Sequence, residues 1–463
     1  MKKYIVYGLG ISGMATAKYL SSNGYFVVAT DDNPNSIENF KKNNSKNYSQ
    51  IKFLNPNEIE YNDQTIIIFS PGIPLFFPKA HSVLKICSET NALLKCDISL
   101  FYKFNSKNNF IGITGTNGKS TTTALTGFIF DNLNLSSQIG GNIGIPCFEL
   151  KQNQQDFTYI FEVSSYQLDL ISDAKFNIAC LTNITPDHID RHGSFENYIN
   201  SKRKIFQLQN ANDFSIINID NTHSRKIYQE LKQDSNRQSN LVAISTNIDV
   251  ENGVSIIKDK LTINLEKQKF TFLIKPQIQG KHNLENIACS IAITSCQLIK
   301  INQFNSQNIE RVIKIIEKFQ GLKHRMQLVK SINNINFIND SKATNAESTE
   351  NALKSFDNIF WILGGRPKDG GIEILKPYFS KIIKAYLIGE STEEFAKILD
   401  QHHVIYEKSQ TLKKAFESAY SDSLLSTKIY KNILLSPACA SFDQWKNFEQ
   451  RGDFFCDLVN EIH

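Results

Sequence analysis

The sequence of 463 residues lacks three features, and each absence excludes a class of protein. Its eight cysteines contain no C-x-x-C pair and lie in mostly apolar or helical surroundings, which favours buried free thiols in a reducing cytosol. The most apolar stretch, residues 65–78, is interrupted by Pro71, Gly72 and Pro74, so no run approaches the roughly 20 residues that span a bilayer. Basic residues form no dense run and the formal net charge is only +5, so nucleic acid is not expected as the main partner. We expect a cytoplasmic protein without stable membrane insertion.

The residues that are present are typical of a soluble globular protein, because 41% are apolar and 21% are charged. The length of 463 residues predicts about three domains. Short apolar runs alternate with segments of helix length, and this alternation predicts parallel sheets covered by helices. The strands expected in the first half of the chain are residues 4–7, 26–29, 65–69, 110–114, 159–163, 178–182 and 214–219. The polar, Asn-rich segments expected to be loops are residues 43–49, 105–109, 151–156 and 233–240.

The second half of the chain begins with a different pattern. Residues 251–275 hold three short apolar runs separated by polar turns, which predicts a small antiparallel β insertion. Residues 282–298 have apolar side chains at helical spacing and are expected to form a helix. A third α/β unit follows, with expected strands at residues 337–339, 359–363, 385–388 and 433–435.

The first glycine cluster, G-L-G-I-S-G at residues 8–13, directly follows an expected strand and opens an expected helix. Asp31 and Asp32 lie just after the second strand. This context fits a dinucleotide or nucleotide-diphosphate site, because glycines allow close approach of the backbone and the start of a helix faces a pyrophosphate. A tight strand-to-helix turn without a ligand is the alternative.

The second glycine cluster, G-T-N-G-K-S-T-T at residues 115–122, follows the expected strand 110–114 and resembles a P-loop. Its backbone N–H groups can surround phosphate oxygens, Lys119 can reach the terminal phosphates, and the Ser120 hydroxyl can bind magnesium. The strict P-loop spacing requires glycine at position 113, where this chain has Ile113, so a generic glycine turn is the alternative.

Two further polar segments come at the ends of expected strands: E-V-S-S-Y-Q at residues 162–167 and N-I-T-P-D-H at residues 183–188. Ligands of parallel sheets bind at the carboxyl ends of strands. Glu162 is therefore placed to hold magnesium beside the phosphates, and His188 could add a nitrogen ligand to a second ion. A surface charge and a helix cap are the alternatives for these two residues.

Together with Lys202, His282-Asn283 and N-D-S-K-A-T-N at residues 339–345, these motifs resemble the Mur ligases of peptidoglycan synthesis. The D-S-K-A-T-N segment and L-S-P-A-C-A-S-F-D-Q at residues 435–444 are most similar to the branch that adds D-glutamate. The resemblance runs from Gly8 to the last expected helix. It implies an ATP-dependent ligase that adds D-glutamate to UDP-N-acetylmuramoyl-L-alanine through an acyl phosphate, in cytoplasmic synthesis of peptidoglycan precursors, and that acts as a monomer.

The resemblance implies an α/β fold of three domains. The first, residues 1–92, is a Rossmann-like UDP-binding domain, and the second, residues 93–320, is a P-loop ATPase-like domain with a parallel sheet and the small β insertion. The third, residues 321–463, is a Rossmann-like α/β domain that holds the amino acid. Because the groups lie on separate domains, domain closure is expected to assemble the site and exclude water from the acyl phosphate.

The site residues implied by the resemblance fall into five groups, with ATP and two magnesium ions as cofactors. Phosphoryl transfer depends on positioning and charge, so Lys119, Glu162, His188 and Lys202 are expected to be catalytic. Ser120, Glu162 and His188 are expected to bind magnesium with Lys202, whose position is carbamylated in this family. The expected ATP contacts are Gly115, Thr116, Asn117, Gly118, Lys119, Ser120, Thr121, Asn283, Asn286, Arg325 and Asp340. The expected contacts to the UDP sugar are Gly8, Gly10, Ile11, Ser12, Gly13, Asp31, Asp32, Ser70, Asn142 and Gln167. The expected contacts to D-glutamate are Lys342, Thr344, Lys368, Ser441 and Phe448.

One position departs from the family pattern, because Asn33 stands where the family often has arginine. A contact on the uridine side is therefore expected to be missing or replaced.

Several alternatives stay open on the sequence alone. Ligases that add L-alanine or a diamino acid, and folylpolyglutamate synthases, share the ATP motifs but differ in the D-S-K-A-T-N segment. A nicotinamide-dependent oxidoreductase would explain the first glycine cluster but leaves the second unexplained. A nucleotide-binding module without catalysis is a further alternative.

Overall fold

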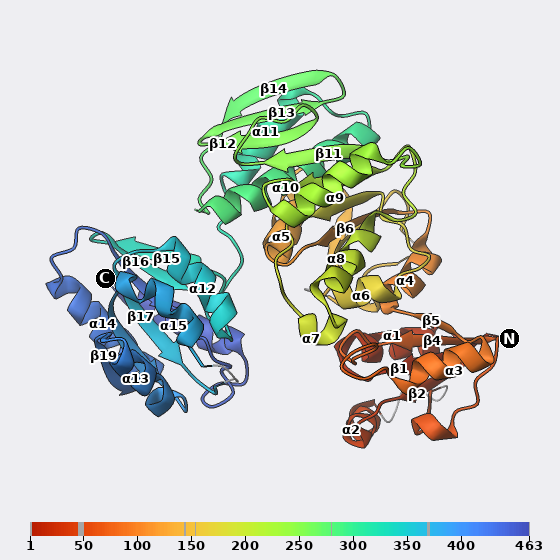
Figure 1. The fold of residues 1–463 in the computed structure, drawn as a ribbon, viewed down its shortest axis with the longest axis horizontal. Coiled ribbons are helices and arrows are strands. Elements are labelled where there is room, and N and C mark those ends of the chain that lie inside the picture. Colours follow the sequence, from red (N-terminus) through yellow and green to blue (C-terminus); the bar gives the residue numbers. More distant parts are fainter. Residues whose placement is uncertain are drawn as a thin grey trace. The chain divides into compact units, whose positions relative to one another are not determined.

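The computed structural model describes residues 2–44, 51–142, 145–152, 154–278, 280–367 and 371–462. The chain forms two compact units, Met1–Phe319 and Gln320–His463. Three sheets of mostly parallel strands, each with helices packed against it, make up an α/β fold (Figure 1). The expected α/β class is confirmed.

The first sheet has five parallel strands in the order β3-β2-β1-β4-β5. Because β1 lies between β2 and β4, the strand order reverses at β1, and such a reversal opens a crevice at the carboxyl ends of the strands. The expected boundary at residue 92 falls before β5, which pairs with β4, so this sheet extends to Lys95. Its elements are β1 (Lys3–Tyr7), α1 (Ile11–Ser22), β2 (Val27–Thr30), α2 (Pro34–Asn44), β3 (Ile51–Phe53), η1 (Pro56–Glu58), β4 (Thr65–Phe69), α3 (Ser82–Thr90) and β5 (Leu93–Lys95).

The second sheet has nine strands in the order β14-β13-β12-β11-β10-β9-β6-β8-β7. Side chains alternate between its faces, since Ile111 and Ile113 belong to one hydrophobic cluster and Phe110 belongs to the other. Its strands are β6 (Asn109–Thr114), β7 (Ser137–Gly141), β8 (Thr158–Glu162), β9 (Ile178–Leu181), β10 (Phe214–Asn218), β11 (Asn240–Ser245), β12 (Gly253–Ile257), β13 (Lys260–Leu265) and β14 (Gln268–Leu273). The helices of this part are α4 (Asp97–Asn105), α5 (Lys119–Asn132), η2 (Cys147–Glu149), α6 (Ser165–Leu170), α7 (Ile189–His192), α8 (Phe195–Arg203), η3 (Lys204–Phe206), α9 (Thr222–Gln233), α10 (Lys281–Lys300) and α11 (Ser306–Ile316).

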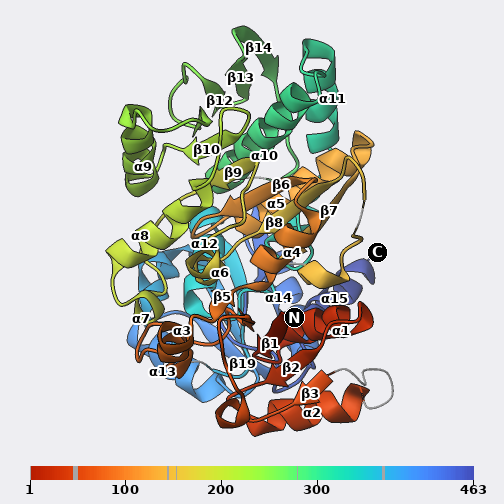
Figure 2. The same cartoon turned by 90° about the vertical axis from the view of Figure 1, so that its right-hand side faces the viewer.

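The expected β insertion continues this second sheet (Figure 2). β12 pairs in parallel with β11, whereas β13 and β14 add antiparallel strands by short turns. The turns after β12 and β13 have no room for crossover helices, so these strands join as hairpins. The expected helix 282–298 is confirmed as α10, which packs on α5.

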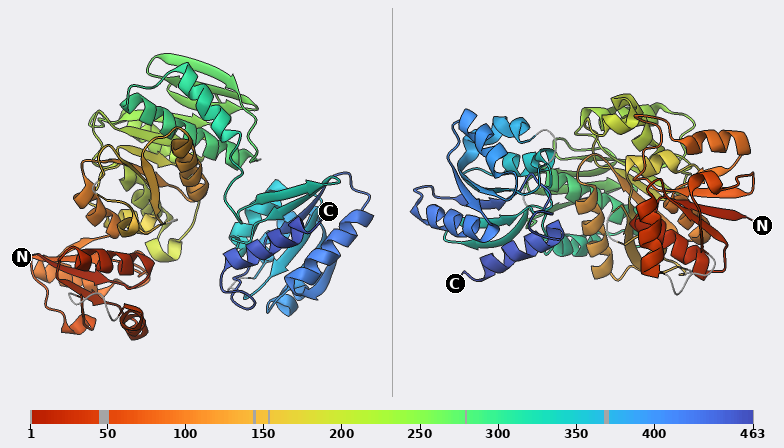
Figure 3. Two further views of the ribbon diagram at one scale, coloured as in Figure 1. Left: turned by 180° about the vertical axis from the view of Figure 1, so that it is seen from behind. Right: turned by 90° about the horizontal axis from the view of Figure 1, so that it is seen from below.

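The unit Gln320–His463 holds the third sheet, in the order β15-β16-β20-β17-β18-β19. Only the pair β15 and β16 is antiparallel among the described strands of this sheet. One hydrophobic cluster lies under α12, η4 and α13, and the other lies under α14 and α15, so both faces are covered (Figure 3). The elements are β15 (Gln327–Ile332), β16 (Ile335–Asn339), α12 (Ala346–Ser355), β17 (Ile359–Gly364), η4 (Glu373–Lys381), β18 (Ile382–Ile388), α13 (Thr392–Gln401), β19 (Tyr406–Gln410), α14 (Leu412–Leu425), β20 (Lys431–Leu435) and α15 (Phe448–Asn460).

All eight cysteines are free thiols, and six of them are buried. None of the described helices is long and apolar enough to span a membrane.

Candidate active site

The second glycine cluster is a tight turn between β6 and α5, as the P-loop interpretation requires. Gly115 and Gly118 have φ angles of +152° and +84°. A Cβ atom on Gly115 would lie 1.9 Å from Thr182 Oγ1, and one on Gly118 would lie 2.2 Å from Asn286 Oδ1. Both positions therefore need glycine for its conformation and for space. Ile113, at the position of the missing motif glycine, is a buried residue of β6 and packs in the core.

The segment that follows β9 holds this turn closed. The Thr182 hydroxyl donates to Asn117 O at 2.6 Å, and Asn183 Oδ1 accepts from the Asn117 N–H at 2.9 Å. Thr116 Oγ1 lies 2.9 Å from the Tyr198 hydroxyl on α8. Thr182 and Tyr198 were not expected at the site, although Tyr198 lies four positions before Lys202 and therefore on the same helix face.

Two lysines lie together at the turn. Lys119 Nζ donates to Gly115 O at 2.8 Å and to Thr116 O at 2.7 Å, and Lys202 Nζ donates to the same Gly115 O at 2.8 Å. Lys202 is only 2% exposed, and its ammonium group lies over the Tyr198 ring. Burial, reinforced by the charge of Lys119, lowers the pKa of Lys202 well below its usual range. A negative group near these lysines would be strongly stabilised.

Glu162 ends β8 beside this turn. Its Oε1 accepts from Asn142 Nδ2 at 2.8 Å, whereas its buried Oε2 has no hydrogen-bond partner. A buried carboxylate oxygen without a partner is costly unless a cation or another donor binds it. The carboxylate therefore has an acceptor available for a ligand.

His188 is the N-cap residue of α7, and its backbone lies in the left-handed region with a φ of +52°. Burial lowers the pKa of His188, opposed by Asp187 and reinforced by Lys119 and Lys202, so the charges of both lysines reach this ring. His192, one turn later, lies 2.9 Å from Ser165 Oγ and stacks on Tyr166. His188 thus belongs to the same cluster as Lys119 and Lys202.

Asn286 of α10 packs directly against the turn. Thr122 Oγ1 donates to Asn286 Oδ1 at 3.3 Å, and Asn286 Nδ2 donates to Asn283 Oδ1 at 3.4 Å. Ser120 and Thr121 lie in the first turn of α5. The structure therefore brings together every expected ATP residue of the unit Met1–Phe319. Arg325 and Asp340 lie in the other unit.

The described His, Cys, Asp and Glu side chains form no group of three or more that could hold a metal ion. The four expected metal ligands would not form such a group, because two of them, Ser120 and Lys202, are not His, Cys, Asp or Glu.

The first glycine cluster turns between β1 and α1. Gly8 has a φ of +96° and its N–H donates to Thr30 O, and a Cβ atom on Gly13 would lie 1.8 Å from Gly8 O. Gly10 precedes α1, whose first residue, Ile11, is 73% exposed. Ser12 follows on the same exposed turn, with its carbonyl accepting from Thr16. The start of α1 is thus open to a ligand.

Asp31 and Asp32 lie beside this turn but have different partners. Asp31 Oδ2 accepts from the Leu9 N–H at 2.7 Å, and its Oδ1 accepts from the Asn33 N–H at 2.9 Å. Asp32 instead bonds to two side chains, Tyr7 and His81. The Ser70 N–H donates to Tyr7 O, so the loop after β4 adjoins the same edge.

Asn142 and Gln167, expected at the muramoyl end, lie in different environments. Asn142 is exposed and reaches Glu162. Gln167 is 2% exposed, its Oε1 accepts from the Ser164 N–H at 3.0 Å, and its side chain also bonds to buried Asp97. Gln167 therefore caps α6 from inside.

In the unit Gln320–His463, Asp340 follows β16 and is buried. Ser436 Oγ donates to Asp340 Oδ2 at 2.7 Å, and the Met326 N–H donates to Oδ1 at 3.1 Å. Burial raises the pKa of Asp340 to about 7, although these hydrogen bonds and Arg325 oppose the shift. Asp340 and Arg325 therefore share one electrostatic site.

Buried Arg451 of α15 joins the two segments that carry Lys342, Thr344 and Ser441, three of the expected D-glutamate residues. Lys342 Nζ lies 5.0 Å from the centre of the Phe448 ring, and Ser441 is 2% exposed. Arg451 donates to Ser341 Oγ, Ser341 O and Cys439 O, which ties the D-S-K-A-T-N segment to the segment that follows β20. Burial lowers the pKa of Arg451 to about 10. Thr344 lies between Lys342 and α12 in the same segment, and Lys368 lies outside the described residues.

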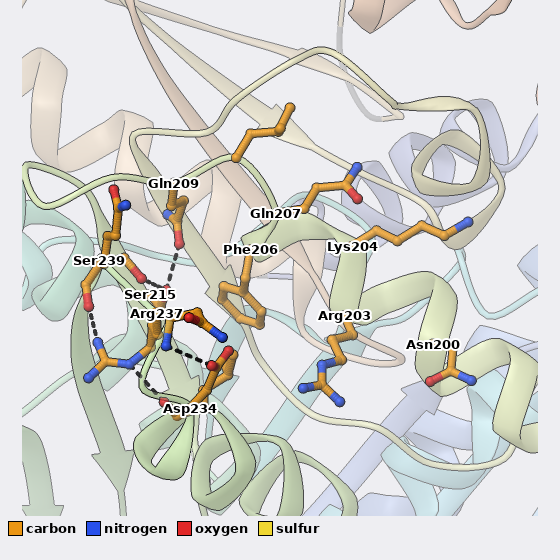
Figure 4. A pocket seen from close by; sticks show the side chains of 14 residues that line it. Asn200, Arg203, Lys204, Phe206, Gln207, Gln209, Ser215, Asp234, Arg237 and Ser239 are labelled. Carbon is orange, nitrogen blue, oxygen red and sulfur yellow. Dashed lines mark hydrogen bonds between the residues drawn. The ribbon is translucent and has the colours of Figure 1, made fainter.

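Two surface cavities adjoin the end of α8. One, of about 420 Å³, is lined by residues of η3, α9 and the segment before β11 (Figure 4). Its polar groups bond to one another, as Ser215 Oγ does to Gln209 Oε1 and Ser239 Oγ. The other, of about 390 Å³, lies against Phe76, Phe77 and His192 and shares Asn200 and Lys204 with the first.

Family models match both units of this chain. A family model of the Mur ligase middle domain matches residues 113–294, and a model of the Mur ligase glutamate ligase domain matches residues 324–438. A protein of Rickettsia bellii named UDP-N-acetylmuramoylalanine–D-glutamate ligase is 40% identical over 459 residues, which are 99% of this chain and 97% of the relative. This chain belongs to the Mur ligase family. It is an ATP-dependent ligase that forms amide bonds.

A further relative and two solved structures also match this Mur ligase. A protein of Rhizobium johnstonii with the same name is 37% identical, covering 99% of this chain and 94% of the relative. Among solved structures, MurF from Acinetobacter baumannii matches with a TM-score of 0.60 at 14% identity, over 99% of this chain and 93% of that chain. The ligase MurC from Thermotoga maritima matches with a TM-score of 0.56 at 15% identity over all of both chains. These two structures share the fold of this Mur ligase.

Proposed function

We propose that this Mur ligase adds D-glutamate to UDP-N-acetylmuramoyl-L-alanine in the cytoplasmic synthesis of peptidoglycan precursors, acting as a monomer. The observation that carries the proposal is the 40% identity, over 99% of the chain, to a relative named for that reaction. The D-S-K-A-T-N segment, which separates the D-glutamate-adding branch from other Mur-type ligases, adds support.

We propose three domains along the chain, with the first boundary moved to follow Lys95. The pairing of β5 with β4 supports this boundary. The central domain then runs to about residue 320, and the remainder forms the domain that holds the amino acid. The division into compact units at Phe319 and Gln320 supports the second boundary.

In the proposed reaction, the carboxylate of the acceptor attacks the γ-phosphate of ATP and ADP leaves. The amine of D-glutamate then attacks the acyl phosphate, displaces phosphate and loses a proton as the amide bond forms. Lys119 would leave its two carbonyl partners for the phosphates, because a charge-assisted hydrogen bond is stronger than a bond to a neutral carbonyl. The N–H groups of Gly115 and Gly118 and of the start of α5 would bind the remaining phosphate oxygens. The Thr116 and Asn117 N–H groups donate to Asn183 instead.

Magnesium fits this site in part. The unpartnered Oε2 of Glu162 is the kind of hard, anionic ligand that magnesium prefers, and Ser120 lies at the P-loop position that binds it. We propose these two residues for one ion, and His188 with modified Lys202 for a second. Magnesium there would offset the negative charge of the phosphates. An unmodified Lys202 does not fit, because an ammonium group repels a cation.

We therefore propose that Lys202 carries carbon dioxide as a carbamate. As the neutral amine, its Nζ would form a bond to the carbon of CO2 and lose one proton, which leaves an oxygen-donating anion in place of a buried amine. Support comes from its 2% exposure, the adjacent charge of Lys119 and the lowered pKa, because these features favour the neutral amine that reacts with CO2.

The carbamate is tested by 13C NMR of the protein in 13C-bicarbonate. A carbamate signal is expected in the wild type and not in Lys202→Arg, whose guanidinium does not form this adduct. Absence of the signal under conditions of full activity would refute the modification.

The proposed function is tested by phosphate release with each nucleotide-sugar acceptor and each amino acid in turn. Release is expected only when ATP, UDP-N-acetylmuramoyl-L-alanine and D-glutamate are all present. Faster release with L-alanine or a diamino acid would assign the chain to another branch. If no combination of nucleotide sugar and amino acid gave phosphate release, the chain would not be a ligase of this pathway.

A further inference from the structure

Asp32 is held by two side chains from different parts of the first sheet. The Tyr7 hydroxyl at the end of β1 donates to Asp32 Oδ1 at 2.6 Å, and His81 Nε2 lies 3.0 Å from Asp32 Oδ2. Tyr7 is 1% exposed, so its hydroxyl has little freedom to move. The loops after β1 and β2 and the loop before α3 thus meet at one carboxylate.

The hydrogen bonds of His81 define its tautomer. His81 is the N-cap of α3, and its Nδ1 accepts from the Val83 N–H at 3.2 Å. A nitrogen that accepts carries no proton, so the ring proton is on Nε2, and Nε2–H donates to Asp32. The ring also lies edge-on to Tyr7 and Phe69, at 5.2 and 5.1 Å between centres, which limits its rotation.

Asp32 keeps acceptor capacity for a ligand. A carboxylate has about four acceptor positions, and Tyr7 and His81 occupy one on each oxygen. The Asp32 side chain is 51% exposed, so the remaining positions face solvent beside the glycine turn. Asp31 differs, because both of its oxygens accept from backbone N–H groups and fix that turn.

We infer that His81 is a positioning residue for the nucleotide-sugar pocket and acts through Asp32. Its Nε2–H holds the carboxylate at the edge of the pocket, where Asp32 accepts from an N–H or O–H of a nucleoside. Asn33 stands where the family often has arginine, and its side chain accepts from the Asn35 N–H in its own turn. Because both oxygens of Asp31 accept from the backbone, Asp32 is the carboxylate of this pair that has open acceptor positions. The inference rests on the proposed function for the identity of the nucleotide sugar.

Two variants of His81 separate this role from helix capping. Asn is a good N-cap, so His81→Asn keeps an acceptor for the Val83 N–H but is too short to reach Asp32. His81→Gln loses the favourable cap but carries an amide N–H at the distance of Nε2. We expect His81→Asn to raise the KM for the nucleotide sugar and the Kd for UDP about tenfold, as expected for a lost hydrogen bond to a charged group. For His81→Gln, the KM for the nucleotide sugar and the Kd for UDP are expected to stay within about threefold of the wild type. Its melting temperature is expected to be lower than that of His81→Asn.

The control measurements are kcat and the KM values for ATP and D-glutamate, which are expected to stay within about twofold in both variants. Asp32→Asn is expected to weaken UDP binding as much as His81→Asn, and the double variant is expected to be no weaker than Asp32→Asn alone, because both act through one contact. Unchanged UDP binding in His81→Asn, or an equal loss in His81→Gln, would overturn the inference.

Calorimetric titration with UDP alone keeps this inference distinct from the ligase proposal. A wild type that binds UDP but ligates no acceptor pair would refute the proposed function and leave the role of His81 to be decided by the variants. A wild type that binds neither UDP nor the nucleotide sugar would overturn the role of His81 as well.

Discussion

At the scale of single residues, burial changes the chemistry of Asp340. Its pKa is raised to about 7, mainly by burial, whereas an exposed aspartate titrates near 3.8. Between these two pH values the folded protein holds a proton that the unfolded chain releases. The free energy of unfolding that this group contributes is therefore greatest below about pH 4 and falls as the pH rises toward 7.

We expect Asp340→Asn to remove this dependence, because the amide keeps an oxygen for Ser436 and does not ionise. The variant should gain stability relative to the wild type between pH 4.5 and 7.5, on the order of 3 kcal/mol. Urea unfolding at the two pH values measures the difference. If the variant and the wild type differed equally in free energy of unfolding at pH 4.5 and at pH 7.5, Asp340 would already be ionised at pH 4.5 in the folded protein.

Glu162→Gln changes the charge of a second buried residue while preserving its shape. The amide oxygen can still accept from Asn142, but the unpartnered Oε2 becomes an NH2 group that cannot bind magnesium. We expect the magnesium concentration for half-maximal phosphate release to rise at least about tenfold, a loss of about 1.4 kcal/mol, with little change in melting temperature.

Exposed Glu149 on η2 offers a matched control, because Glu149→Gln removes the same charge outside the cluster. The magnesium requirement of this control should equal that of the wild type. A normal requirement in Glu162→Gln would remove this residue from the proposed ligands.

At the scale of elements, most interior strands could be predicted, whereas several edge strands could not. The runs at residues 65–69 and 359–363 are fully buried in β4 and β17 and read as continuous apolar segments. β3 and β19 lie at sheet edges and were not expected, because only part of each is buried and polar residues interrupt the pattern. β11 was not expected either, since it begins with Asn240 in a segment that reads as a loop.

The same contrast holds for the candidate site. The positions of Lys119 and Glu162 could be predicted, because Glu162 ends β8 and Lys119 follows β6 after one tight turn, where a parallel sheet collects its polar groups. His81 and Tyr198 could not, because their partners are far away in the sequence and meet them only in the folded chain. Hydrogen bonds of this kind leave no local pattern.

The glycine turn before α5 gives a prediction about an element. Gly118→Ala forces a side chain into the left-handed region and places its Cβ 2.2 Å from Asn286 Oδ1. Gly24→Ala imposes a similar φ, +79°, with nothing within 4 Å. Gly24→Ala should cost about 1 kcal/mol of stability, and Gly118→Ala should cost at least 1 to 2 kcal/mol more and raise the KM for ATP.

Thermal unfolding and ATP titration of the two variants test this prediction. Equal stabilities would show that α10 shifts to accept the added atom, and the turn would then be less tightly packed than its hydrogen bonds indicate.

At the scale of the whole molecule, the hydrophobic clusters divide between the two units. The two clusters of the third sheet contain residues from 326 to 462, and the others contain no residue beyond 319. We expect residues 320–463 to fold as a separate chain with one cooperative thermal transition, because the fragment keeps its whole core. Circular dichroism during heating measures this, and a transition without cooperativity would show that the first unit is needed for its packing.

The bonds of Lys119 to its own turn bear on how the enzyme completes a cycle. An ammonium group that can bind Gly115 O and Thr116 O has neutral partners available whenever a phosphate departs. Departure therefore leaves no buried donor stranded, and the release of products is eased by this exchange of partners. The lysine that we propose to hold the nucleotide would thus also ease its release.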